Sequence, residues 1–273
     1  MSPDVDDPAA EASAAGRTGT GVYVYGVTRA PADTVTTTLR GVGDPPATVR
    51  AVEGGDLAAL VSDVRAGWTA ARREDVEAHD HLLSRTIESA TVVPMRFGVV
   101  MPSEDHVRED LLERHGEEIR TLVARVDGKV QMTLKAFYLG EALLRAALER
   151  NPQLKRRSDA LRDRPADAMH QERIALGRDV AAAVEAQRSA DEQLLLDPLM
   201  PVVDDAVAQA LASERMALNA QLLVARDRRD ELDGLVRELS ERHGDRFSFR
   251  YVGPLAPFSF TSLTLDMPED RWG

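Results

Sequence analysis

The sequence predicts an α+β protein of two domains, each built on a small antiparallel sheet. Strand-like and helical patterns between residues 21 and 101 follow the order strand, helix, strand, strand, helix, strand, which is the βαββαβ order of a ferredoxin-like domain. Farther along, three runs alternate apolar and polar residues with the period of a half-buried strand. The expected parts are a tail at 1–20, a ferredoxin-like domain with connecting helices at 21–127, an α+β domain at 128–262 and a second tail at 263–273.

The first 20 residues are acidic and rich in small residues. They lack the basic start and apolar stretch of a signal peptide, so we expect a disordered tail. No run of about 18 apolar residues occurs, so no membrane span is expected. The chain has no cysteine, which removes disulfides and thiolate metal sites and fits a reducing compartment. These features together predict a cytoplasmic protein.

The N-terminal domain opens with GVYVYGV at 21–27, a β-rich run bounded by glycines. A weak helix is expected from Asp33 to Arg40. Two short strands, ATVRAV at 47–52 and LAALVSDV at 57–64, then follow. Gly54-Gly55 lies between them and suits a tight hairpin turn, because glycine adopts positive φ without strain.

A helix is expected at 72–90, where apolar residues recur on one stripe. The members of this stripe are Val76, Leu83, Ile87 and Ala90. Residues 91–101, TVVPMRFGVVM, form a strand pattern that Pro94 interrupts. Proline has no amide hydrogen to donate to a sheet, so we expect this strand to lie at an edge or to break there.

Two helices are expected to follow. Ser103 has the residue type of an N-cap for the first, and Gly116 is expected to end it. The second helix is expected to end at Asp127-Gly128. Its apolar stripe consists of Ile119, Leu122, Val123 and Val126.

The C-terminal domain is predicted to hold a three-stranded sheet with a long helical insertion at 139–213, a charged stretch punctuated by prolines. A helix is expected at 228–243, with Asp227 as its N-cap. The buried faces of the three strands are expected to be Val130, Met132, Leu134, Ala136 and Tyr138; then Met216, Leu218, Ala220, Leu222 and Val224; and finally Phe247, Phe249 and Tyr251.

Charge limits the class of partner. The chain has 34 basic and 46 acidic residues and a formal charge of −12. Such a chain is repelled by nucleic acids and by anionic membranes, so neither is expected as a partner. The one dense basic run, Lys155-Arg156-Arg157, has acidic neighbours and is interpreted as a solvated helix surface.

Sequence motifs of catalysis and cofactor binding are absent. The chain contains no G-x-x-x-x-G-K-[ST], H-E-x-x-H or G-x-S-x-G. His79 and His81 cannot share a metal ion, because residues two apart on a helix point about 200° apart. Clustered aspartates such as Asp204-Asp205 are interpreted as solvated carboxylates. We therefore expect no catalytic, cofactor or metal site, and no enzyme.

Aromatic placement is the unusual feature. Four of the six phenylalanines lie between 247 and 260, and Phe97 follows Pro94 closely. Both segments are interpreted either as core and sheet edge or as apolar surface presented to another protein. The two interpretations are compatible if Phe247 and Phe249 point inward while Phe258 and Phe260 stay available. The candidate structural and interface residues are Pro94, Met95, Arg96, Phe97, Gly98, Gly253, Pro254, Leu255, Pro257, Phe258 and Phe260.

Four motifs in this order give the chain a resemblance to a known family. They are the strand Tyr-Val-Tyr-Gly-Val at 23–27, the box Val-Val-Pro-Met-Arg-Phe-Gly at 92–98 after a helix with His79 and His81, Leu-Asn-Ala-Gln-Leu-Leu-Val at 218–224, and Tyr-x-Gly-Pro-Leu-x-Pro-Phe-Ser-Phe at 251–260. Over residues 21–262 the sequence resembles the gas vesicle protein F/L family. The motifs do not separate an F-type from an L-type role.

The resemblance implies a non-enzymatic accessory protein of gas vesicle assembly. It implies a ferredoxin-like N-terminal domain and an α+β C-terminal domain. The implied partners are the apolar wall subunit and other accessory proteins, with a role in starting or chaperoning the wall and a possible place on its gas-facing surface.

Two questions stay open at this level. Pro257, Phe258 and Phe260 either close the seam between the two domains, which we favour, or form an edge for a partner strand. A different functional class, a cytosolic small-molecule-sensing module, is the alternative, because paired ferredoxin-like domains often bind small molecules.

Overall fold

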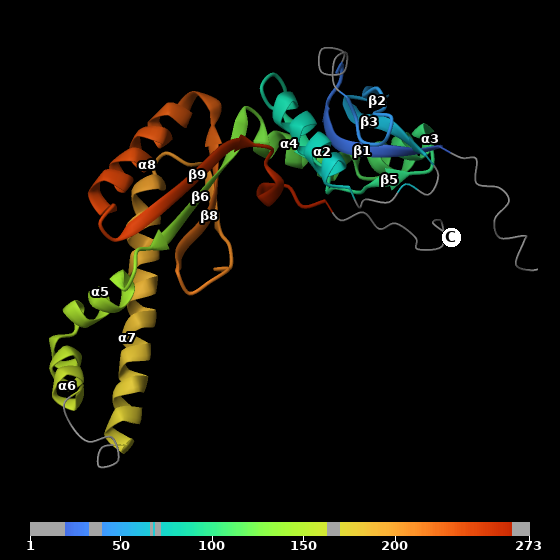
Figure 1. The fold of residues 1–273 in the computed structure, drawn as a ribbon. Helices are drawn as coiled ribbons and strands as arrows, with labels where there is room; N and C mark the ends of the chain where they lie inside the picture. The colour runs from blue at the N-terminus through green and yellow to red at the C-terminus, as the bar shows by residue number, and fades with distance from the viewer. Residues whose placement is uncertain (1–19, 33–39, 66–67, 69–71, 163–169, 264–273) are drawn as a thin grey trace, which may run out of the picture. The chain divides into compact units, whose positions relative to one another are not determined.

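The computed structural model describes residues 20–32, 40–65, 68, 72–162 and 170–263 (Figure 1). The chain forms two compact units. The first unit comprises Met1–Asp127 together with Ala256–Gly273, and the second comprises Gly128–Leu255. The segment that begins at Ala256 therefore groups with the N-terminal domain, whereas we predicted a C-terminal domain that extends to 262.

The first unit contains an antiparallel sheet with strand order β2-β3-β1-β4. A fifth strand, β5, pairs with β1 beside β4. The strands are β1 (Thr20–Arg29), β2 (Arg50–Gly54), β3 (Leu57–Arg65), β4 (Val92–Pro94) and β5 (Val100–Met101). Because helix α2 (Arg73–Thr86) connects β3 to β4, this order confirms the predicted ferredoxin-like class. The helix expected from Asp33 to Arg40 lies outside the described residues up to position 39.

Two local features of this sheet follow from single residues. The β2–β3 hairpin turns at Gly55, which has a φ of +64°. The predicted interruption at Pro94 is confirmed, since β4 ends there and β1 is its one partner among the described strands. Beyond it, the amide of Met95 still donates to the carbonyl of Tyr25 at 2.9 Å, so the chain stays beside β1 until β5 begins.

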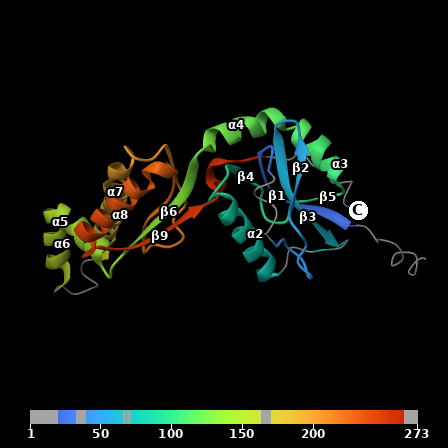
Figure 2. The same ribbon diagram turned by 90° about the horizontal axis from the view of Figure 1, so that it is seen from above.

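Helices lie on both sides of the first sheet, with α2 on one side and α4 on the other (Figure 2). The second layer consists of α3 (Glu104–His106), a π-helical stretch η1 (Val107–Glu113) and α4 (Gly116–Val126). Both faces of β1 are consequently buried from Val22 to Thr28. The Ser103 side chain accepts the amide of His106, which confirms the expected N-cap.

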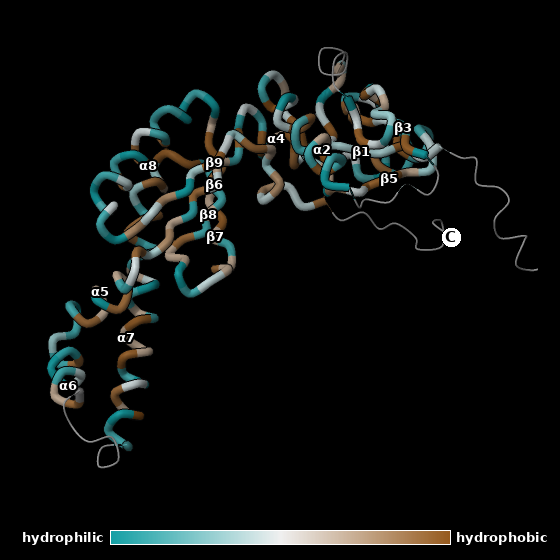
Figure 3. The backbone as a smooth tube through the Cα atoms, viewed as in Figure 1, coloured by the Kyte–Doolittle hydropathy of each residue, from teal (hydrophilic) through white to brown (hydrophobic). Residues whose placement is uncertain are grey.

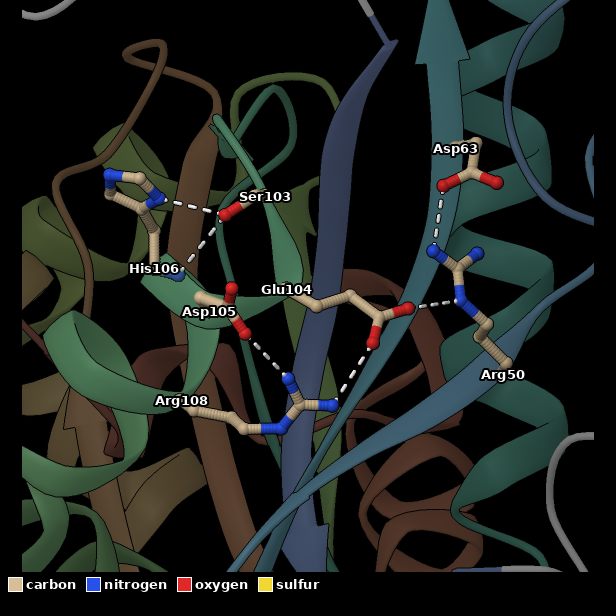
Figure 4. A network of polar contacts seen from close by, with 7 residues as sticks. All are labelled: Arg50, Asp63, Ser103, Glu104, Asp105, His106 and Arg108. Carbon is tan, nitrogen blue, oxygen red and sulfur yellow. Dashed lines mark hydrogen bonds and ion pairs between the residues drawn. The ribbon is translucent and has the colours of Figure 1, made fainter.

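A polar network attaches the start of this second helical layer to the sheet (Figure 4). Arg50 on β2 contacts Asp63 on β3 at 2.7 Å and Glu104 at 2.8 Å. Arg108 contacts the same Glu104 at 3.0 Å and also Asp105 at 3.0 Å. The shared carboxylate of Glu104 thus joins β2 to the first turn after Ser103, and the two arginines hold its pKa below the usual range.

The predicted stripe of α2 is confirmed in part. Leu83 and Ile87 are buried as expected, whereas Val76 is 38% exposed. At the start of the helix the buried face is formed by the polar residues Asp75 and His79 instead. These polar residues can be buried because each has a hydrogen-bond partner: the Tyr23 hydroxyl for His79, and the amide of Gly43, which donates to Asp75.

The second unit has the same strand order as the first. Its antiparallel sheet runs β7-β8-β6-β9. The strands are β6 (Lys129–Tyr138), β7 (Asp205–Ala208), β8 (Met216–Ala225) and β9 (Phe247–Leu255). Strand β7 lies inside the stretch predicted as helical insertion, so the expected three-stranded sheet has four strands. With β7 included, this unit is also ferredoxin-like. Its first crossover, the connection from β6 to β7, is longer than that of the first unit.

That crossover consists mainly of three helices. They are α5 (Ala142–Arg150), α6 (Pro152–Arg162) and α7 (His170–Leu196), followed by the short turn η3 (Asp197–Leu199). The later helix α8 (Arg229–His243) follows the turn η4 (Arg226–Arg228). Its N-cap is Arg228 and not Asp227 as predicted, because Asp227 lies within η4. The hydrophobic residues of both units are concentrated on the strands (Figure 3).

Helix α7 is fixed to the second sheet through Asp191, which is 1% exposed. Its carboxylate accepts hydrogen bonds from Tyr138 at 3.2 Å, Gln187 at 2.9 Å and Arg246 at 2.5 Å. Arg188 lies over the ring of Tyr138, with 5.7 Å between its guanidinium carbon and the ring centre. These contacts join α7 to β6 and to the residue before β9.

Candidate interaction surface

The candidate residues of the sequence fall into three places. Residues 94–98 begin with the last residue of β4 in the first unit, and residues 257–260 belong to the C-terminal segment of the same unit. Residues 253–255 end β9 in the second unit. The first two groups meet at His79 on α2. Its ring centre lies 5.6 Å from that of Phe97 and 6.3 Å from that of Phe258.

His79 lies at the middle of a group of aromatic rings in the first unit. We call this group the aromatic cluster. Its members are Tyr23, Tyr25, Trp68, His79, Phe97 and Phe258. Tyr23 contacts most of the others, with ring centres 4.8 Å from Tyr25 and 5.2 Å from Trp68. Several of the ring pairs are edge-to-face, for example Trp68 and Phe97.

Hydrogen bonds fix the orientation of Tyr23 and His79. The Tyr23 hydroxyl accepts the amide of Gly98 at 3.0 Å and lies 2.9 Å from Nδ1 of His79. The bond between Tyr23 and Nδ1 of His79 is buried, and which of the two atoms donates depends on the tautomer of His79. Gly98 thereby connects the segment after β4 to the middle of the aromatic cluster.

Hydrogen bonds also fix the orientation of Tyr25, and its position explains why residue 41 is a glycine. Its hydroxyl accepts the amide of Val42 at 2.7 Å and lies 2.8 Å from Oγ of Ser62. A Cβ atom added to Gly41 would overlap the Tyr25 hydroxyl and Oγ of Ser62. The close approach of this backbone therefore requires glycine. Burial raises the pKa of Tyr25, and burial likewise raises that of Tyr23.

The C-terminal segment Ala256–Thr261 exposes one ring. Ala256, Pro257, Phe260 and Thr261 are buried, while Phe258 is 38% exposed. The hydroxyl of Thr261 donates to the carbonyl of Pro257 at 2.9 Å and closes the segment on itself. The prediction that Phe260 is available was therefore wrong, because this ring anchors the segment. Phe258 lies at the surface, in contact with the buried His79.

The remaining candidates have structural roles. Pro94 and Met95 are buried beside β1, and Arg96 is exposed. Gly253 has a φ of +154°, and an added Cβ would overlap Sδ of Met132. This glycine therefore permits the close approach of β9 to β6 at the register shift between them.

Sequence reasoning missed most of the aromatic cluster. Tyr23 and Tyr25 alternate on β1, which places both rings on one face. Together with a histidine on the following helix, this spacing was an available signal. No sequence signal pointed to Trp68, because its position depends on the path of the chain between β3 and α2. Among the described residues, no three histidine, aspartate or glutamate side chains lie close enough to hold a metal ion together.

The burial of His79 predicts a pH-dependent stability. Desolvation lowers its pKa from 6.5 to about 4, and an interaction with the backbone of Met95 opposes this only in part. The unfolded state binds the extra proton first, so the stabilisation is complete above pH 6.5 and is lost as the pH falls from 6.5 to about 4. The loss should approach about 3 kcal/mol.

We expect urea unfolding of the first unit to show this slope between pH 7 and 4.5, and His79→Gln to flatten it. His81→Gln is the matched control, because His81 is exposed on the same helix. Equal slopes for His79→Gln and the parent protein would contradict the assignment.

The fold and this surface define a two-unit α+β protein whose most distinctive feature is an aromatic cluster with one exposed ring. Residues 21–262 match the family model described as gas vesicle synthesis protein GvpL/GvpF. The chain belongs to this family, and its role is in gas vesicle formation.

Individual relatives agree with this assignment. Gas vesicle protein F of Streptomyces sp. (strain CB03234) is 35% identical over 87% of this chain and 98% of its own length. Gas vesicle protein L of the same strain is 30% identical over 88% and 92%. The crystal structure of GvpF from Anabaena sp. PCC7120 matches with a TM-score of 0.80 and 22% identity, over 90% of this chain and 100% of that one. Among the described residues, no helix is both long and apolar enough for a bilayer crossing.

Proposed function

We propose that this protein is a non-enzymatic accessory protein of gas vesicle assembly. It binds the apolar wall subunit, and other accessory proteins, in the cytoplasm before and during assembly of the wall. The observation that carries this proposal is the exposed ring of Phe258, which a buried anchor holds against the aromatic cluster. A pre-organised aromatic residue of this kind is typical of the energetic centre of a protein interface.

The physical need for such a partner supports the proposal. A wall that excludes liquid water requires subunits with a continuous apolar face. In water this face favours aggregation by roughly 25 cal/mol for each Å² of apolar surface. A partner that covers the face, and that carries a charge of −12, keeps the complex dispersed by electrostatic repulsion.

The decisive experiment is a pull-down of the wall subunit with Phe258→Ala. We expect this change to lower co-purification at least tenfold. It should lower the free energy of unfolding by only about 1 kcal/mol, because the ring is partly exposed. Thermal unfolding checks the second expectation.

Leu194→Ala is the matched control, because Leu194 on α7 is also 38% exposed. It should leave the pull-down unchanged. Wild-type protein that fails to retain the wall subunit, or a deletion strain that still floats normally, would overturn the proposal. The sensing alternative gains support only if a thermal-shift screen finds a tightly bound small molecule.

A further inference from the structure

One face of the second sheet carries two cations side by side. Lys135 on β6 and Arg250 on β9 are direct cross-strand partners in the antiparallel register. Both residues are therefore on the same face and in the same row of the sheet. Like charges placed directly opposite each other disfavour strand pairing. The fold thus tolerates a local electrostatic cost at this position.

Among the described residues, neither cation has an ion-pair partner. Lys129, on the same face of β6, differs from them because its ammonium contacts the carboxylate of Asp204 at 3.1 Å. Arg250 is exposed and Lys135 is partly exposed, so a partner carboxylate can approach both.

One apolar side chain lies in each of the two rows next to the cations. Val252, which is 41% exposed, and Thr133 form the next row in one direction. Phe137 and Ser248 form the next row in the other direction. The opposite face of the sheet is the one on which α8 packs, as the hydrogen bond from Tyr251 to Asp233 shows. The row of Lys135 and Arg250, with its two neighbouring rows, is called the cation face below.

We propose that the cation face binds a carboxylate-bearing segment of another gas vesicle protein, with apolar residues next to its acidic ones. Two uncompensated cations with Val252 on one side and Phe137 on the other match that chemistry by charge and by the neighbouring apolar surface. Phosphate polymers fit less well, because the net charge of −12 repels them over longer distances. The inference rests on the proposed function, since it names the surface that a second protein partner uses.

Charge reversal at Arg250 tests the proposal, because it is expected to weaken partner binding while leaving stability unchanged or increasing it. Arg250→Glu turns the cross-strand repulsion into attraction, so the melting temperature should stay constant or rise. The same change should weaken partner binding. A merely structural role for Arg250 would lower binding and stability together.

The assay uses the full chain, tagged and coexpressed with its wall subunit and sister accessory proteins. The variants are Arg250→Glu, the double variant Lys135→Glu/Arg250→Glu and the control Arg237→Glu, whose arginine is exposed on α8. We expect the double variant to retain at least tenfold less of one gas vesicle protein, while the control retains it fully. A lysine placed at an acidic residue of that protein should restore its retention by the double variant.

The outcomes are separable. Equal retention by the double variant and the control overturns this inference alone. Absence of every gas vesicle protein from the wild-type eluate overturns the proposed function and this inference with it. Loss of bound RNA, of anionic vesicles or of a homodimer in the double variant, with protein partners retained, assigns the face to a different occupant and overturns the inference.

Discussion

Replacement of Asp191 by alanine is expected to lower the free energy of unfolding of the second unit by about 3–5 kcal/mol. The carboxylate is 1% exposed and accepts hydrogen bonds from Tyr138, Gln187 and Arg246. Its removal leaves the guanidinium of Arg246, which is 26% exposed, without its counter-charge. Removal of one partner of a buried ion pair costs more than the pair itself contributes, because the other charge remains desolvated.

The measurement must report on the second unit by itself, since two units need not unfold together. Hydrogen exchange of the β6 and β8 amides in the presence of urea provides this. Glu185→Ala, also on α7, is the control, because Glu185 is exposed and its contact with Arg188 is 3.8 Å long. It should change stability by less than about 0.5 kcal/mol. A similar small effect for Asp191→Ala would show that Asp191 does not hold α7 on the sheet.

Replacement of Phe97 by alanine is expected to destabilise the first unit by about 2–3 kcal/mol, less than for a fully buried aromatic residue, because this ring is half-buried. Its ring lies between Tyr23, Trp68 and His79, with centre-to-centre distances of 6.1, 6.0 and 5.6 Å. The change leaves a cavity in the aromatic cluster beneath the segment that carries Gly98. Tyr23 and His79 should lose packing contacts as a result.

The fluorescence of Trp68 makes this unfolding visible. A Trp272→Phe background removes the signal of the second tryptophan, which lies outside the described residues. Arg96→Ala is the control, because Arg96 is exposed next to Phe97 in the chain. A loss of wall-subunit binding by Phe97→Ala without a loss of stability would place Phe97 in the interface instead of the core.

The amino-acid sequence by itself determined the elements with a clear period. Strands β6, β8 and β9 were predicted at their places in the chain, because their residues alternate between apolar and polar. The predicted buried face is confirmed for β6, whereas β8 is buried on both faces and only Phe247 is fully buried on β9. The break at Pro94 followed from a missing amide hydrogen, and the βαββαβ order of the first unit followed from the succession of patterns. The family resemblance rested on short motifs of these same elements.

Only the tertiary structure decided the features that depend on distant residues. Strand β7 has four residues and no distinct period, so it is defined by its pairing with β8. His79 can be buried because the Tyr23 hydroxyl of β1 is its hydrogen-bond partner, and Phe260 is buried because its segment packs on the first unit. The adjacency of Lys135 and Arg250 is set by the register of two strands far apart in the chain. Local patterns encode which side of an element is apolar, whereas long-range register and packing decide what each side meets.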